Sequence, residues 1–252
     1  MFRWLFVAGT ALLAVHPAAF ASAGYSVEEF SQSYALSSQG RIFLENLNGD
    51  VRISTWDRDE VKVEAVKRAV RPERLGDARI VVDSEADTLS IRTQYAAGAD
   101  DPASVEYRIT VPRRATLGDV KLVNGGLSIV GLSGDVKASA VNGSIRAEQL
   151  EGEADLSTVN GQLEAGFNRL AGSRAISLSS VNGPITLMLP ADARAVVNAR
   201  NLAGGIQSDF GQKAEAAAAG GHRLNTVIKG GGTRIHLHNV NGGIQISRGK
   251  IG

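Results

Sequence analysis

The pair His236 and His238 comes closest, among the side chains of this sequence, to the spacing of a metal site. Ile235 and Leu237 alternate with the histidines, so on a β-strand both imidazoles would point outward on the same face. Zinc normally takes three or four protein ligands, and no third ligand is evident beside this pair. We therefore expect solvent-facing histidines, no bound metal and no cofactor.

Acidic residues gather in two short segments that could be read as calcium loops. Calcium is held by about six oxygen atoms, and its loops carry a glycine and a terminal glutamate that these segments lack. Polar side chains are also what turns between strands contain, so we interpret both segments as solvated turns. The segments are Asp57, Asp59 and Glu60 with Arg58 among them and Trp56 beside them, and Asp83, Glu85 and Asp87.

Sugar-cleaving enzymes with a β-helix fold need paired carboxylates, or a base with cations, on one outer face. Here the charged residues at outward positions of successive blocks are mixed in sign: Lys137, Arg146, Asp155 and Glu164. No serine stands in the setting of a catalytic nucleophile. The sequence therefore predicts a protein without catalytic residues, with a polysaccharide-active enzyme as the least favoured alternative.

Residues 1–23 have the pattern of a secretory signal peptide. Arg3 precedes an apolar run over residues 4–15, and small residues follow, ending at Ala21 and Ala23. The run is too short to span a bilayer stably, and no second apolar segment approaches the necessary length. We therefore expect an exported protein, periplasmic or secreted to the cell surface, with no transmembrane segment in the mature chain.

Charge and cysteine content narrow the range of partners. Removal of residues 1–23 takes away Arg3, which leaves 27 − 1 = 26 basic side chains against 26 acidic ones. Binding of nucleic acid needs clustered Lys and Arg, and we expect no nucleic acid partner for this balanced chain. The chain has no cysteine, so neither a disulfide framework nor a cysteine-linked lipid anchor is available.

A unit of the form Val-Asn-Gly recurs along the chain and sets the positions of the candidates above. Its asparagines at 124, 142 and 160 are 18 residues apart (142 − 124 = 18 and 160 − 142 = 18), and Gly134 and Gly152 lie midway. Apolar residues alternate within each block of nine, which predicts β-strands with one buried face. The copies are Leu47-Asn48-Gly49, Val123-Asn124-Gly125, Val141-Asn142-Gly143, Val159-Asn160-Gly161, Val181-Asn182-Gly183 and Val240-Asn241-Gly242.

The alternation slips by one position before each unit, for example between Ala138 and Val141. Such a slip moves side chains to the opposite face unless the backbone turns, so the chain must bend there. A strand-and-turn unit of nine residues fits an antiparallel meander with Asn-Gly hairpins, or a solenoid of stacked coils. The return of the same residues on every second strand favours the solenoid, because equivalent positions then lie on one another.

In a solenoid the repeated asparagines stack along the axis. Stacked amides can hydrogen-bond to one another and so satisfy polar groups at a tight corner. A ligand-binding role of the repeated unit is the alternative, because regular coils create extended surfaces. We interpret the ladder as structural. It consists of Asn124, Asn142, Asn160, Asn182 and Asn241.

The sequence thus predicts an all-β fold, a single-stranded parallel β-helix or β-solenoid, with about two strands per 18-residue coil and irregular N-terminal strands. Residues 24–252 would form one domain, with regular coils over about 117–190 and final coils over about 227–248. The alanine-rich segment 211–222 breaks the pattern and is expected to be an insertion, either a short helix or a loop.

The order of these motifs resembles a known family. The segments LENLNGDVRISTWDRDEVKVEAVKRA, VEYRITVP, the tandem VNG units and GGGTRIHLHNVNGGIQI are similar to those of an exported, bacterial putative-adhesin family of unknown function. The likeness runs from about Ile42 to Ile246. It implies a β-solenoid and supplies no catalytic residues, and the adhesin label is itself an inference from the fold.

We expect the chain to work as a non-enzymatic protein of the cell envelope that presents an extended surface for adhesion, or for binding a protein or a glycan. Self-assembly into an envelope scaffold is the second hypothesis, because an uncovered coil end leaves strand edges that pair with another chain. Residues 24–40 could cover the N-terminal end, whereas Ile246 to Gly252 leave little chain to cover the last coil. The sequence thus predicts self-association through the C-terminal coil.

Overall fold

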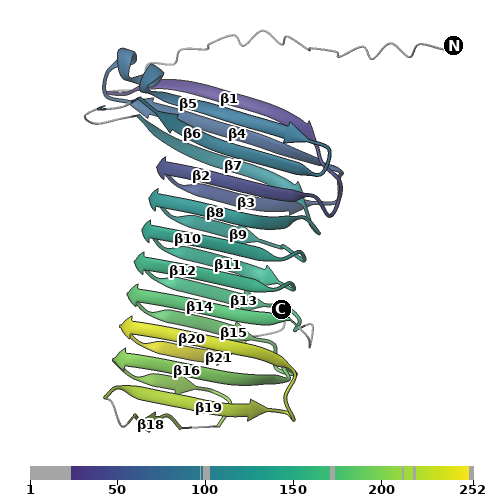
Figure 1. Ribbon diagram of the computed structural model, residues 1–252, viewed down its shortest axis with the longest axis vertical. Coiled ribbons are helices and arrows are strands. Elements are labelled where there is room, and N and C mark those ends of the chain that lie inside the picture. Colours follow the sequence, from purple (N-terminus) through teal and green to yellow (C-terminus); the bar gives the residue numbers. More distant parts are fainter. Residues whose placement is uncertain are drawn as a thin grey trace, which may run out of the picture.

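The computed structural model describes residues 24–96, 98, 103–170, 174–211, 213–217 and 220–249. The expected signal peptide, residues 1–23, lies outside the described residues. Two β-sheets run along the described chain and form a tall stack (Figure 1). None of the helices in the described ranges is both long and apolar enough to cross a membrane.

The two sheets, called sheet 1 and sheet 2 below, contain 10 and 11 strands. In spatial order, sheet 1 consists of β1 (Ser26–Ala35), β4 (Glu60–Ala69), β7 (Ser104–Pro112), β3 (Val51–Trp56), β9 (Leu127–Val130), β11 (Ile145–Leu150), β13 (Leu163–Phe167), β15 (Ile185–Leu189), β21 (Ile244–Arg248) and β17 (Ile206–Ser208). Sheet 2 consists of β18 (Glu215–Ala216), β19 (His222–Ile228), β16 (Ala195–Ala203), β20 (Thr233–Asn241), β14 (Ala175–Asn182), β12 (Ala154–Asn160), β10 (Val136–Asn142), β8 (Thr116–Asn124), β2 (Arg41–Asn48), β6 (Thr88–Tyr95) and β5 (Ala78–Glu85). A short 3-10 helix, η1 (Pro72–Asp77), connects β4 to β5.

Between β8 and β15 the chain alternates between the two sheets. β10 and β12 pair in parallel with Ser139 opposite Ser157, and β11 and β13 pair in parallel with Ile145 opposite Leu163. Both shifts are of 18 residues (157 − 139 = 18 and 163 − 145 = 18), so equivalent positions of neighbouring coils lie side by side. The coarse fold prediction, an all-β chain with long parallel sheets, is therefore confirmed.

One apolar core fills the space between the sheets. Alternate residues of each strand point inward, as in β12, where Ala154 and Leu156 are buried and Asp155 is exposed. Many inward positions hold alanine, such as Ala147 and Ala165, which suits a narrow cross-section in which two strand faces approach closely. Burial of each larger aliphatic side chain contributes roughly 1.5–3 kcal/mol.

The C-terminal strands do not lie at the end of the stack. β20 pairs in parallel with β14 on one side and with β16 on the other, and β21 pairs likewise with β15 and β17. Figure 1 shows this yellow pair between green coils. Inserted there, both strands gain hydrogen bonds along both edges, whereas an end position would offer one edge. The prediction of an uncovered C-terminal coil is wrong. The expectation of self-association through that coil therefore loses its structural basis.

The N-terminal part has the same inserted arrangement. β2 lies between β8 and β6, and β3 lies between β9 and β7. Beyond them the pairing becomes antiparallel, between β7 and β4, between β4 and β1, and between β6 and β5. β1 therefore forms the outer edge of sheet 1, in the region 24–40 that was expected to cover this end of the stack.

The alanine-rich segment 211–222 lies at the opposite end of the stack. Residues 212, 218 and 219 fall outside the described residues. The described remainder contains no helix; its short strand β18 pairs antiparallel with β19, which pairs antiparallel with β16. A two-residue outer strand offers little edge for another chain to pair with.

Candidate functional site

The Val-Asn-Gly units lie at the corner where the chain passes from sheet 2 to sheet 1. β10 ends at Asn142 and β11 begins at Ile145, so the bend falls between them. The Nδ2 of Asn142 donates to Oδ1 of Asn124 at 3.0 Å, and the Nδ2 of Asn160 donates to Oδ1 of Asn142 at 2.8 Å. Equivalent amides of neighbouring coils are therefore bonded to one another along the stack.

The ladder of amides continues through the inserted coils. Asn182 donates to Asn160 and Asn241 donates to Asn182, both at 2.9 Å, so all five asparagines assigned to the ladder lie in one line. Asn124 donates to Asn48 at 2.9 Å, which adds a rung that the sequence did not assign because 76 residues separate the two. At the other end the register partner of Asn241 is Ala203, which ends the ladder.

The glycines that follow the asparagines leave no room for a side chain. A Cβ on Gly143 would overlap the carbonyl oxygen of Gly125, and a Cβ on Gly161 would overlap that of Gly143. Gly242 also has a φ of 139°, in the left-handed region that favours glycine. Coils spaced about 4.8 Å apart thus stack closely at this corner, which gives the Asn-Gly sequence a structural reason to recur.

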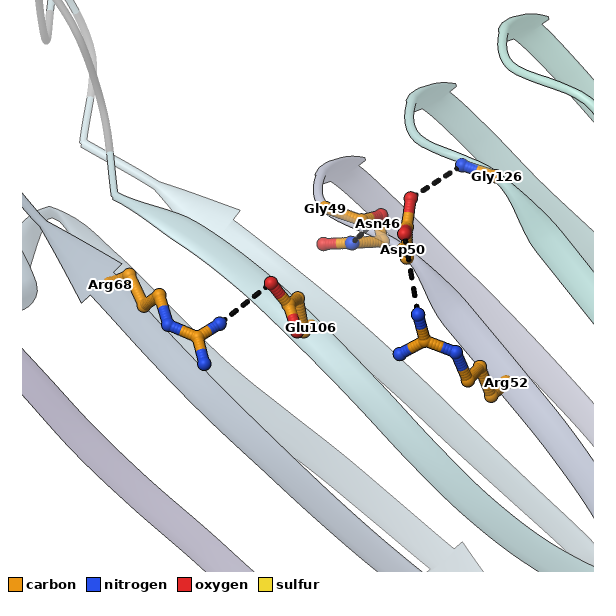
Figure 2. Close-up of polar contacts among 7 residues, drawn as sticks. All are labelled: Asn46, Gly49, Asp50, Arg52, Arg68, Glu106 and Gly126. Atoms are coloured by element: carbon orange, nitrogen blue, oxygen red, sulfur yellow. Dashed lines mark hydrogen bonds and ion pairs between the residues drawn. The ribbon is translucent and has the colours of Figure 1, made fainter.

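Asn46 lies just inside the corner, two residues before the first asparagine of the ladder. Its Nδ2 donates to the carbonyl oxygens of Gly49 at 3.0 Å and of Val105 at 2.9 Å. Figure 2 shows Asn46 turned toward Gly49, while Asp50 reaches the next coil. Oδ1 of Asp50 accepts from the backbone amide of Gly126 at 2.8 Å. Side chains thus satisfy corner groups that the sheets leave unpaired.

The equivalent position inside later corners is also polar and buried. Oγ1 of Thr158 donates to the carbonyl oxygen of Gly143 at 2.9 Å, and Nδ2 of Asn201 donates to that of Gly242 at 2.6 Å. The sequence interpretation missed this inner column. Its signal was a polar residue at an inward position of the alternation, where the neighbouring coils carry Ala140 or Leu122.

A row of aliphatic side chains, exposed except for the half-buried Val240, runs beside the ladder on the outer face of sheet 2. Each member precedes a ladder asparagine or Ala203, and exposure reaches 41% for Val141 and 59% for Leu202. In-register pairing places neighbouring members about 4.8 Å apart. Single exposed apolar residues are ordinary, but a continuous line of them indicates a contact surface. The aliphatic row consists of Leu47, Val123, Val141, Val159, Val181, Val240 and Leu202.

His236 and His238 are exposed and point outward from β20. No group of three or more His, Asp or Glu in the described part of the chain could hold a metal ion. The two histidines and their neighbours line a shallow depression on sheet 2. The neighbours are hydrogen-bonding groups and one cation. They are Ser177 and Ser179 of β14, and Asn198 and Arg200 of β16.

An arginine pairs with a carboxylate in each of the two acidic segments, and the structure places Asp83 and Glu85 on β5 and not in the expected turn. Oδ1 of Asp57 accepts from Nε of Arg113 at 3.1 Å, and Oδ2 of Asp83 accepts from Arg92 at 2.6 Å. The two pairs come from different sheets, since Arg113 follows β7 and Arg92 belongs to β6. These carboxylates face cations and solvent, an arrangement unlike that of a calcium loop.

The charged residues considered for sugar cleavage do not share a face. Lys137 and Asp155 lie on β10 and β12 of sheet 2, whereas Arg146 and Glu164 lie on β11 and β13 of sheet 1. Arg146 and Glu164 form an ion pair at 2.7 Å. The structure therefore separates these four side chains into an ion pair and two residues on the other face, and brings no carboxylate pair together among them.

The outer face of sheet 1 carries charges that are paired across strands and within a strand. Figure 2 shows Arg68 of β4 against Glu106 of β7, with 2.7 Å between Nη1 and Oε1. Lys62 and Glu64, both on β4, lie 2.8 Å apart. Exposed pairs of this kind contribute little to stability and leave a solvated, charge-balanced surface.

Tyr107 of β7 is the largest fully buried side chain and the one ionisable group placed deep in the described core with a large pKa shift. Its hydroxyl lies 2.7 Å from Oγ1 of Thr93. Burial raises the pKa of Tyr107 to about 12, against a smaller lowering by the hydrogen bond with Thr93. A phenol that stays protonated in the core acts as a packing residue at neutral pH.

Residues 114–247 match the family model of Toastrack DUF4097, which covers the regular coils, the aliphatic row apart from Leu47, and the inserted C-terminal coil. The chain belongs to this family, and the resemblance stated from the sequence motifs is confirmed. Among curated proteins, none matches the chain.

Three solved structures are similar to this chain at low sequence identity, and the first of the three has a TM-score above 0.5. A putative cell adhesion protein from Clostridium sporogenes is 12% identical, with 88% of this chain and 100% of that chain covered and a TM-score of 0.54. A putative adhesin from Bacteroides fragilis is 14% identical, with 88% and 97% covered and a TM-score of 0.47. A putative lipid binding protein from Parabacteroides distasonis is 12% identical, with 88% and 97% covered and a TM-score of 0.28.

Proposed function

We propose that this chain is a non-enzymatic, exported binding module of the cell envelope that holds an extended glycan along the outer face of sheet 2. The observation that carries the proposal is the aliphatic row beside the asparagine ladder. Aliphatic side chains pack on the apolar face of a sugar ring, and amides beside them bond to its hydroxyl groups. A surface that repeats at every coil suits a partner that is itself a chain of repeated units.

Adhesion is compatible with such a surface. The structural relative with a TM-score of 0.54 is described as a putative cell adhesion protein. At 12% identity that likeness concerns the fold, so the argument for binding rests on the aliphatic row of this chain.

A self-assembling scaffold is the competing function, and the ends of the stack disfavour it. Antiparallel strands β1 and β5 form the edges at one end, and the two-residue β18 and the three-residue β17 form the edges at the other. Of these four strands β17 alone pairs in parallel with its neighbour, and its three residues offer little edge to the next coil of a continuing solenoid.

Lysine substitutions in the aliphatic row test the proposed function. Val141→Lys and Val159→Lys replace exposed side chains, so the fold should persist while binding weakens by about tenfold or more through loss of apolar contact. Co-sedimentation with purified cell-wall glycan measures the affinity, and Gln245→Lys on the outer face of sheet 1 is the matched control. Equal binding by all three variants, or no binding by the unchanged protein, would contradict the proposal.

A further inference from the structure

The depression around the two histidines differs from the rest of the outer face of sheet 2. Strand register places His236 between Ser177 and Asn198, and His238 between Ser179 and Arg200. The six side chains thus form two parallel rows across β14, β20 and β16, and they line one shallow depression. Each offers a hydrogen bond to a ligand, and none is a carboxylate.

The cations of this region have no carboxylate partner. Within the described residues, no Asp or Glu lies within ion-pair distance of Arg200 or of Arg234, the next outward residue of β20 before His236. Toward the other end of the same face the pattern is different: Lys121 lies 2.8 Å from Asp119 and 3.5 Å from Glu45. Among the described side chains, Arg200 and Arg234 thus leave positive charge uncompensated at the depression, as Lys137 does on β10 of the same sheet, whereas Lys121 is paired.

Carboxylates border the depression without entering it. Asp155 of β12 is the register neighbour of Ser177, and Glu215 of β18 is the register neighbour of Arg223 on β19, one strand beyond Arg200. An anion is therefore favoured over β20, β16 and Arg223 of β19, and disfavoured beside Asp155 and Glu215. This limits the site to a few strands, which are about 4.8 Å apart.

We propose that this depression binds the carboxylate of an acidic sugar within an envelope glycan. The guanidinium of Arg200 offers a planar fork for a carboxylate, the histidines add donors, and the serine and asparagine side chains match sugar hydroxyl groups. The assignment rests on the proposed function, because it places the acidic sugar on the same glycan that the aliphatic row holds. A membrane surface is the poorer match, since the depression has no aromatic or protruding apolar side chain to enter a bilayer.

Titration calorimetry with oligogalacturonate tests the proposal, and its methyl-esterified form is a neutral control of the same backbone. We expect the acidic oligomer to bind at least about tenfold more tightly than the ester, and Arg200→Gln to remove about that factor. Arg146→Gln, on the outer face of sheet 1, should leave binding unchanged. Added salt should weaken binding of the acidic oligomer, because the site is exposed.

The histidines give a second readout. Both side chains line the depression beside Arg200, so the double substitution His236→Gln with His238→Gln should weaken binding of the acidic oligomer by severalfold. The double variant keeps Arg200, Arg223 and Arg234, so unchanged binding would show that the histidines do not contact the ligand.

The outcomes separate this proposal from the one on which it rests. Equal binding of acid and ester that is lost in Val159→Lys but kept in Arg200→Gln overturns the acidic-sugar site and leaves the glycan-binding face standing. Binding of neither oligomer by folded protein overturns the acidic-sugar site. So does binding only to phosphatidylglycerol vesicles, or displacement of the oligomer by an equal concentration of inorganic phosphate.

Discussion

Removing neighbouring rungs of the asparagine ladder should destabilise the protein less than the sum of the single removals. Asn142→Ala breaks the bonds to Asn124 and Asn160, and Asn160→Ala breaks the bonds to Asn142 and Asn182. The bond between Asn142 and Asn160 is common to both. The double variant therefore loses three hydrogen bonds, where two independent losses would total four.

The magnitude follows from the net value of one exposed hydrogen bond. At roughly 0.5–1.5 kcal/mol each, a single interior substitution costs about 1–3 kcal/mol. Asn241→Ala breaks one bond, to Asn182, and should cost about half as much as an interior substitution. The coupling free energy between neighbouring rungs should equal one bond, about 0.5–1.5 kcal/mol, and fall to near zero for Asn142 paired with Asn241.

The ladder also offers a substitution in the opposite direction. Ala203 occupies the ladder position beyond Asn241, is exposed, and precedes Gly204, whose φ of 121° is that of the other corners. Ala203→Asn should therefore add one rung and raise the free energy of unfolding by about 0.5–1.5 kcal/mol. The stability gained by Ala203→Asn and the stability lost by the interior Asn→Ala substitutions would both come from the same kind of amide hydrogen bond.

Urea unfolding of the four single variants and the two double variants measures these quantities. Midpoints compared at constant m-value report the change in stability, and a changed m-value would reveal that coils unfold separately. Strict additivity for Asn142 with Asn160, together with no gain from Ala203→Asn, would refute the interpretation of the ladder as a stabilising chain of amides.

Three further outcomes are expected. Gly143→Ala should cost about 1–3 kcal/mol in urea unfolding, because its Cβ would overlap the carbonyl of Gly125, whereas Gly126→Ala has room and should be nearly neutral; equal costs would contradict the close stacking of corners. Burial raises the pKa of Tyr107 from 10.0 to about 12, so the buried neutral phenol contributes its full stability below pH 10. About 3 kcal/mol of the free energy of unfolding is then lost as the pH rises through 12. Tyr107→Phe should lose less stability over that pH range than the unchanged protein. An equal loss in both proteins would contradict this role of Tyr107. Asparagines before glycine deamidate when the glycine nitrogen attacks the side chain, but Gly143 and its equivalents donate that N–H to the next coil. Peptide mapping after alkaline incubation should find that these asparagines deamidate about tenfold or more slowly in folded than in unfolded protein. Equal rates would show that the corners open freely.

The regular coils could be predicted from the sequence because their signals are local and repeated. The apolar pattern changes between Ala138 and Val141 and so predicts a corner close by, but the alternation of β10 does not slip: Val141 points outward and the chain bends after Asn142. The return of Asn142 at Asn160 sets the register that the strands adopt. The order of the coils could not be predicted in this way. Insertion of β20 beside β14 depends on which free edges meet, and the local sequence of both strands is that of any other coil.

The candidate site was predictable only in part. Alternation places His236 and His238 outward, and the structure has them exposed. Their neighbours come from β14 and β16, which lie before β20 in the chain but on opposite sides of it in space, so Arg200 could not be assigned to them from sequence spacing. The aliphatic row was visible in the repeated unit, yet only the register shows that its members form one continuous line.

The insertion of the last coil has a consequence for how the molecule is made. β16 and β17 leave the ribosome before β20 and β21, which are their parallel neighbours and which, among the described strands, join them to the coil of β14 and β15. A chain without β20 and β21 would leave unpaired the parallel edges of β14, β15, β16 and β17 that these two strands fill. The coil of β20 and β21 thus closes a gap between parts of the stack that are made earlier.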